Sequence, residues 1–114
     1  MSSRGEALVR ELALALPGVV EGTSYGTAAF RVRKKLFARM GKGGEWLVLK
    51  TDFDEREILM EAAPGTYFIT DHYLNHPMLL VRLSAVETAE LEEILEQSWR
   101  RMAPKRVLAA FDRT

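Results

Sequence analysis

The segment FRVRKKLFARMGKGG at residues 30–44 carries six basic side chains and no acidic one. Its apolar residues alternate with the charges, as in a strand that buries one face and exposes the other. Cations that project from a rigid hairpin can hold the phosphate groups of a nucleic acid. The candidate phosphate-binding residues in this segment are Arg31, Arg33, Lys34, Lys35, Arg39 and Lys42.

A second basic group lies near the C-terminus, and we add Lys105 and Arg106 to the candidate nucleic-acid-binding set. Two aromatic residues, Phe37 and Trp46, could stack on bases or lie against sugar. The acidic residues concentrate in other parts of the chain, so this region would keep a positive field. The alternative interpretation is a solvated hairpin, since charged edges also deter strand-to-strand aggregation.

The segment TDHYLNHP at residues 70–77 places Asp71, His72 and His76 within six residues. Histidines four residues apart can chelate a metal when they share a helix face. Pro77 and the strand-like flanks make a helix unexpected here, so no metal site is predicted. The main interpretation is a structural loop whose histidines bond to backbone or carboxylate. A ligand-binding or acid–base role is the alternative, and a weaker one is a metal-dependent or hydrolytic enzyme centred on His72 and His76.

The loop GTSYGT at residues 22–27 could meet this histidine loop in a cleft. This arrangement would make a protein-interaction or small-ligand domain, with no particular protein partner indicated. Tyr25 and Tyr73 are each also expected to be a half-buried ring whose hydroxyl is hydrogen-bonded. The alternative ligand-binding residues are Tyr25, His72, Tyr73 and His76.

The sequence lacks the usual patterns of catalytic and cofactor sites. The loop EGTSYGT is neither a P-loop nor a nucleophile elbow, and a dinucleotide-binding glycine motif and an EF-hand loop are absent. The chain contains no cysteine, which excludes disulfides, thiolate zinc sites and a cysteine nucleophile. We therefore predict a non-enzymatic protein with no catalytic residue, no metal and no cofactor.

Length and composition indicate a single globular domain over residues 1–114, with 47% apolar and 28% charged residues. Sixteen basic residues balance sixteen acidic ones, so any site for a polyanion must be a local patch. No stretch approaches the roughly 18 apolar residues of a membrane span. We expect a cytoplasmic protein without a membrane partner.

The periodicity of apolar residues predicts an α+β domain in the order α-βββ-α-ββ-α-α. An antiparallel sheet in a two-layer sandwich would carry the helices on one face. The glycine- and threonine-rich residues 17–27 are expected to form a loop. Helices are expected at 3–16, 52–65, 87–103 and 105–111, and strands at 30–32, 36–40, 45–51, 66–70 and 78–83. Trp99 lies on the apolar stripe of the long helix and is expected in the core.

The alternation in the basic hairpin predicts its register. A turn through residues 33–35 would pair Val32 with Leu36 and Phe30 with Ala38, which places both apolar rows on one face. The opposite face is then expected to carry Arg31, Arg33, Phe37 and Arg39.

Four segments carry a resemblance to a known family, in this order: LPGVVEGTSYGTAAFRV, KKLFARM, TDHYLNHPMLLVRL and SWRRMAPKRV. Over about residues 12–108 the chain resembles the MmcQ/YjbR family of small bacterial proteins. The resemblance implies a CyaY-like α+β fold and a double-wing DNA-binding motif. DNA would then be a partner, bound weakly and in a salt-dependent way. Many members carry glycine where this chain has Lys34, which adds a charge at the tip of the candidate wing.

Overall fold

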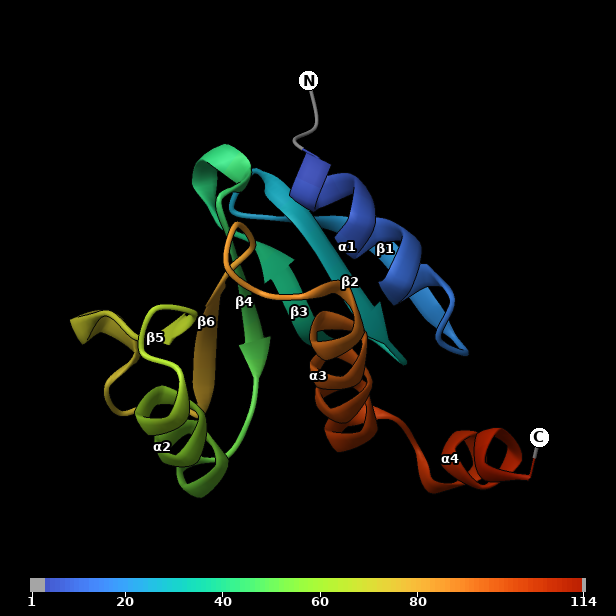
Figure 1. The fold of residues 1–114 in the computed structure, drawn as a ribbon. Coiled ribbons are helices and arrows are strands. Elements are labelled where there is room, and N and C mark those ends of the chain that lie inside the picture. Colours follow the sequence, from blue (N-terminus) through green and yellow to red (C-terminus); the bar gives the residue numbers. More distant parts are fainter. Residues whose placement is uncertain (1–3, 114) are drawn as a thin grey trace.

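The computed structural model describes residues 4–113 and shows one antiparallel six-stranded sheet in the order β1-β2-β3-β4-β6-β5. Figure 1 shows helices α1 and α3 lying across one side of this sheet. This arrangement confirms the predicted α+β fold class. The elements are α1 (Arg4–Leu14), β1 (Val19–Ser24), β2 (Thr27–Val32), β3 (Lys35–Met40), η1 (Lys42–Gly44), β4 (Trp46–Lys50), α2 (Phe53–Ala62), β5 (Tyr67–Phe68), η2 (Asp71–Tyr73), β6 (Met78–Arg82), α3 (Thr88–Met102) and α4 (Lys105–Asp112).

The predicted loop at residues 17–27 is wrong, because most of it forms the edge strand β1. This strand pairs with β2 along its whole length, from Val19 opposite Val32 to Ser24 opposite Thr27. The strand ends in glycine and hydroxyl residues rather than in apolar alternation, so its pattern resembles that of a loop. The observed order is therefore α-ββββ-α-ββ-α-α, one strand more than predicted.

The β2–β3 hairpin turns at two residues rather than three. Arg33 and Lys34 both have positive φ angles, of 51° and 69°, as a tight type I′ turn requires. The predicted pairing of Phe30 with Ala38 is confirmed, but Val32 lies opposite Lys35 instead of Leu36. The two pairings differ in register because the sheet carries a bulge.

The bulge turns Phe37 into the core, so the prediction that it lies on the outer face is wrong. The register shifts between Phe30 and Arg31, and both Phe37 and Ala38 are fully buried. An extra residue in one strand interrupts the ladder of backbone hydrogen bonds. The side-chain hydroxyl of Ser98 in α3 donates to the carbonyl of Phe37 at 2.7 Å, which anchors the bulge to the helix.

Helix α3 supplies the centre of the core between the sheet and the helices. Its inward side chains include Leu91, Leu95 and Trp99, and Trp99 is fully buried as predicted. The indole nitrogen of Trp99 donates to the carbonyl of Pro17 at 3.0 Å. The ring of Phe111 in α4 packs edge-on against Trp99, with centroids 5.1 Å apart. These contacts fix α4 to the end of the sheet where β1 begins and β2 ends.

No helix in residues 4–113 has the length and apolar character needed to cross a lipid bilayer.

Candidate functional site

The sheet face opposite α1 and α3 carries its own small apolar cluster, which we call the open face. Val48, Met78 and Leu80 are buried there, and Trp46, Phe68 and Tyr73 pack around them half buried. The guanidinium of Arg82 lies 4.0 Å from the ring centroid of Phe68. Aromatic rings and arginine side chains therefore shield this face in place of a helix layer.

Arg39 occupies the middle of the open face, in register with Ala29 on one side and Val48 on the other. Its guanidinium donates a hydrogen bond to the hydroxyl of Tyr73 and lies 5.8 Å from the ring centroid of Tyr25. Tyr73 is half buried with a bonded hydroxyl, as predicted. Tyr25 is 88% exposed, so the same expectation for this residue is wrong.

The loop between η2 and β6 is held in place by Arg56 of α2, whose side chain is buried. The guanidinium of Arg56 donates to four main-chain carbonyls, at distances of 2.7–3.2 Å. The acceptors are the carbonyls of Tyr73, Leu74, His76 and Met78. The planar guanidinium of Arg56 thus binds four carbonyl groups of a loop that has little regular secondary structure.

The sequence did not indicate a role for Arg56, because the acid-rich segment around it is typical of a solvated helix face. Its only distinguishing signal is that it is the one basic residue in DFDEREILMEA. The helix begins after Asp52, whose carboxylate accepts a hydrogen bond from the backbone nitrogen of Glu55 at 2.7 Å. Arg56 lies on the side of α2 that faces the loop.

The two histidines of the loop lie close together without forming a metal site. The rings of His72 and His76 are stacked with centroids 5.9 Å apart, and the ring of Tyr73 meets His72 edge-on at 4.7 Å. Within residues 4–113 no group of three or more histidine, aspartate or glutamate side chains is placed to hold a metal ion. Both histidine side chains are exposed.

A groove of about 770 Å³ runs across the open face between the β1–β2 turn and the histidine loop. The structure therefore brings together three of the four predicted ligand-binding residues, namely Tyr25, His72 and Tyr73, whereas His76 does not line the groove. Arg39 and Lys42 also line it. Carboxylate side chains do not occur among its lining residues in the described part of the chain, so the groove favours an anion.

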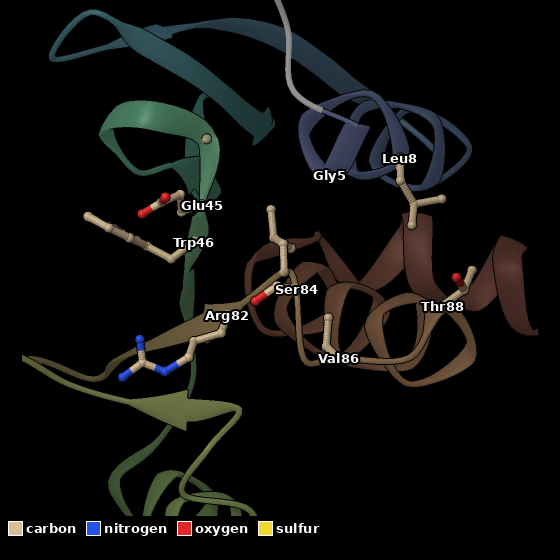
Figure 2. A pocket seen from close by; sticks show the side chains of 10 residues that line it. Gly5, Leu8, Glu45, Trp46, Arg82, Ser84, Val86 and Thr88 are labelled. Carbon is tan, nitrogen blue, oxygen red and sulfur yellow. The ribbon is translucent and has the colours of Figure 1, made fainter.

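Trp46 forms one wall of this groove and depends on a glycine for its position. A Cβ atom on Gly41 would lie 2.0 Å from the indole nitrogen of Trp46, which is far inside van der Waals contact. Trp46 also borders a second cavity of about 820 Å³ next to α1 and the start of α3. In Figure 2 the side chains of Trp46 and Arg82 extend away from α1, toward the open face.

The six candidate cations of the basic segment are not neutralised by carboxylates. The ion pairs found within residues 4–113 involve only Arg10, Arg100 and Arg101. Arg31 lies beside Gly22 and donates a weak hydrogen bond of 3.4 Å to the carbonyl of Thr23. The remaining cations of the segment are exposed at the hairpin tip or in η1: Arg33, Lys34, Lys35 and Lys42.

The structure separates Lys105 and Arg106 from Arg31 and Arg39. Both are exposed on α4, which belongs to the helix layer, although α4 lies at the same end of the molecule as the β2–β3 turn. Arg100 next to them is bound by Glu96 and Asp112. Hydrogen bonding to Arg100 holds the pKa of the Asp112 carboxyl below its usual value. The neighbouring charge of Arg100 is therefore neutralised, whereas Lys105 and Arg106 form none of the ion pairs found within residues 4–113.

Comparison with known proteins finds a family model that matches most of the chain and relatives that match about half of it. A family model described as YjbR matches residues 14–101. The uncharacterized proteins Mb2600 of Mycobacterium bovis and Rv2570 of Mycobacterium tuberculosis are 42% identical over 53 residues. That match covers 46% of this chain and 41% of each relative's length, so the chain spans less than half of these proteins.

A solved structure has the same fold. The crystal structure of Deinococcus radiodurans protein DR2400, whose domain is classed as DUF419, superposes with a TM-score of 0.69 and 24% sequence identity. The superposition covers 80% of this chain and 72% of that protein. At this level of identity the similarity shows the shared fold alone.

Proposed function

This chain belongs to the YjbR family, and we propose that it binds nucleic acid through the open face of the sheet and the tip of the β2–β3 hairpin. One observation carries the proposal. The segment from β2 to η1 holds six cations, and none of them is paired with a carboxylate in the described part of the chain. Such a segment keeps a local positive field although the chain has no net charge.

The positions of these cations suit contacts with a phosphate backbone. Arg31 and Arg39 project from neighbouring strands on the open face, and Arg33 and Lys34 form the exposed hairpin tip. Phosphate contacts of this kind orient a protein on nucleic acid and carry no base sequence information. We expect weak binding with little sequence preference, with a Kd on the order of 10⁻⁴ to 10⁻⁶ M at physiological salt.

The backbone of the hairpin tip supports a functional role for its charges. Arg33 and Lys34 both occupy the left-handed region, where residues other than glycine, asparagine and aspartate cost about 1–2 kcal/mol. Asn-Gly would form the same turn without this cost. Arg33 and Lys34 thus occupy strained backbone positions, although both are exposed and neither is in an ion pair found within residues 4–113. Folding alone does not favour charged residues at such positions.

Fluorescence anisotropy with a labelled oligonucleotide tests this proposal. The double variant Arg33→Ala, Lys34→Ala should weaken binding at least several-fold at low salt, because it removes two phosphate contacts. The variant Lys105→Ala, Arg106→Ala removes the same charge from α4 and should change affinity much less. Equal effects of the two variants would show that only net charge matters, and would contradict a site on the hairpin.

A second candidate function is favoured by the groove. Its lining by Tyr25, Arg39, His72 and Tyr73 and its volume of about 770 Å³ fall in the range of sites for small ligands. A small anionic ligand held there would bind independently of Arg33 and Lys34 at the hairpin tip. Titration with small anions against the hairpin-tip variant therefore distinguishes this candidate from nucleic-acid binding.

A further inference from the structure

We infer that the groove on the open face accepts an unpaired nucleotide, so that the domain prefers single-stranded to double-stranded nucleic acid. This inference rests on the proposed function and specifies which form of nucleic acid the site selects. The groove combines aromatic rings from two walls with two cations, and this is the combination that holds a base and its phosphate.

The first observation behind this inference is the exposed ring of Tyr25. Its side chain is 88% exposed, and its φ angle of 52° places it in the left-handed region of a two-residue turn. A large ring at this position pays a conformational cost and, being exposed, adds little to the core. Exposed aromatic rings beside a cationic groove are the platforms on which bases of single strands stack.

Trp46 supplies a second ring, and its position is fixed. It lies half buried in the groove wall, and Gly41 leaves the space that the indole occupies. Arg39 lies in the same groove, with its guanidinium held by the Tyr73 hydroxyl and facing the ring of Tyr25. The groove thus has two aromatic surfaces and an oriented guanidinium, with Lys42 at its edge.

The shape of the site disfavours a base pair. Inside a duplex the faces of the bases are stacked on one another, so a ring in a groove cannot reach them unless the strand is unstacked. The groove volume of about 770 Å³ lies in the range that encloses a drug-sized ligand, and a nucleotide is of that size. An unpaired nucleotide can place its base in the groove and its phosphate on Arg39 or Lys42.

The test compares a labelled thymidine 12-mer with a duplex of the same length by anisotropy at fixed salt. We expect the wild-type protein to bind the single strand roughly ten-fold more tightly than the duplex, because stacking of a base adds at least about 1 kcal/mol. Tyr25→Asn should reduce single-strand affinity by about 5-fold or more, since stacking on one base is worth this much. Duplex affinity should be unchanged, and Tyr25→Phe should retain the single-strand affinity.

The choice of variants separates binding from folding. Asparagine adopts positive φ more readily than tyrosine, so Tyr25→Asn should fold at least as well as the wild type. Trp46→Leu should lower single-strand affinity in the same way. Ile58→Ala is the control, because Ile58 is a 61% exposed apolar side chain on α2 that does not line the groove. It should leave both affinities unchanged.

Fluorescence quenching gives an independent signal from the groove. The chain has two tryptophans, and Trp99 is fully buried in the core. Quenching by the single strand should therefore come from Trp46 and disappear in Trp46→Leu. Thymidine monophosphate alone should quench only at much higher concentration; quenching by it as readily as by the 12-mer would assign the groove to free nucleotides and overturn the strand preference.

The remaining outcomes distinguish failure of this inference from failure of the proposed function. Equal binding of single strand and duplex, with no effect of Tyr25→Asn, would overturn the inference and leave phosphate binding by the hairpin standing. Absence of binding to both forms at low salt would overturn the proposed function itself.

Discussion

Arg39 in β3 donates a hydrogen bond to the hydroxyl of Tyr73, a residue 34 positions later in the chain. This contact joins the middle of the open face to the histidine loop, which Arg56 holds from the other side through four carbonyls. The groove is therefore built between two segments whose relative position depends on two arginines. Each of these contacts makes a prediction that can be measured.

Replacing Tyr73 with phenylalanine removes the acceptor for Arg39 and leaves the ring in place. We expect the free energy of unfolding in urea to fall by about 0.5–1.5 kcal/mol, the net value of one hydrogen bond. The affinity for a duplex should remain, because Arg39 keeps its charge. A variant as stable as the wild type would show that this contact contributes nothing to holding the loop.

Arg56→Met should destabilise the protein by about 3 kcal/mol or more, because several hydrogen bonds to a buried cation are lost together. The side chain is 3% exposed, so solvent cannot easily replace it. Amide exchange should quicken at Tyr73–Met78, the segment whose carbonyls it binds.

Arg56→Lys is the informative control for this prediction. Lysine keeps the charge but has no planar fork that could reach the same four carbonyls. It should therefore recover only part of the lost stability and leave loop exchange fast. Full recovery by lysine would mean that charge, and not the geometry of the guanidinium, holds the loop.

Lys34→Gly should change stability and binding in opposite directions. Glycine accepts the φ angle of 69° at this position without a steric penalty, so the free energy of unfolding should rise by about 1 kcal/mol. Affinity for the oligonucleotide should fall, since one phosphate contact is lost. If the variant were more stable and also bound as tightly, the lysine at the tip would have no role in recognition.

Ser98→Ala tests the anchor of the bulge. Ser98 is 1% exposed, and its hydroxyl is a donor to the Phe37 carbonyl. Removing it leaves a buried carbonyl without that partner, which costs about 1–3 kcal/mol. Ser84→Ala, an exposed serine in the loop after β6, should change stability by no more than about 0.5 kcal/mol. Similar losses in both variants would argue against a special role for the bulge.

Asp52 at the start of α2 should make stability depend on acidity. The backbone N–H of Glu55 and the charge of Arg101 hold the pKa of the Asp52 carboxyl below its ordinary value of 3.8. Because the folded pKa is below the unfolded one, the stabilisation is present above about pH 4. It is lost as the pH falls through the folded pKa.

Chemical denaturation of Asp52→Ala at several pH values measures this dependence. The wild type should be more stable than the variant at pH 7, and the difference should shrink as the pH falls below about 4. Glu57→Ala, an exposed residue of the same helix, is the control. A difference that stays constant from pH 7 to pH 3 would contradict the role of the ionised carboxylate.

The sequence predicts the layers of this fold but not two details of its sheet. Strong periodicity locates α3 and places Trp99 in the core, because a regular helix repeats its pattern over several turns. Alternation fails at Phe37, where a bulge adds one residue. Phe37 and Ala38 are therefore both buried, and Leu36 before them lies opposite Arg31. Strand β1 is missed because its glycine and hydroxyl residues form backbone pairs with β2 without an alternating apolar signal.

The candidate site could be predicted only in part from the sequence. Clustering of basic residues is visible directly, and two loops that could meet in a cleft are visible as GTSYGT and TDHYLNHP. The burial of Arg56 and the exposure of Tyr25 are not visible, because both contradict the usual preference of their residue types. Only the tertiary arrangement shows that Arg39 connects Tyr25 to Tyr73.

The salt dependence of oligonucleotide binding tests the proposed function most directly. If the hairpin and the open face neutralise about four to six phosphates, log K against log salt should have a slope near −3 to −4 for a single strand and near −4 to −5 for a duplex. Arg33→Ala, Lys34→Ala should reduce the steepness by about 1.4 for the single strand and by about 1.8 for the duplex. An unchanged slope in that variant, or no salt-dependent binding by the wild type, would contradict the account.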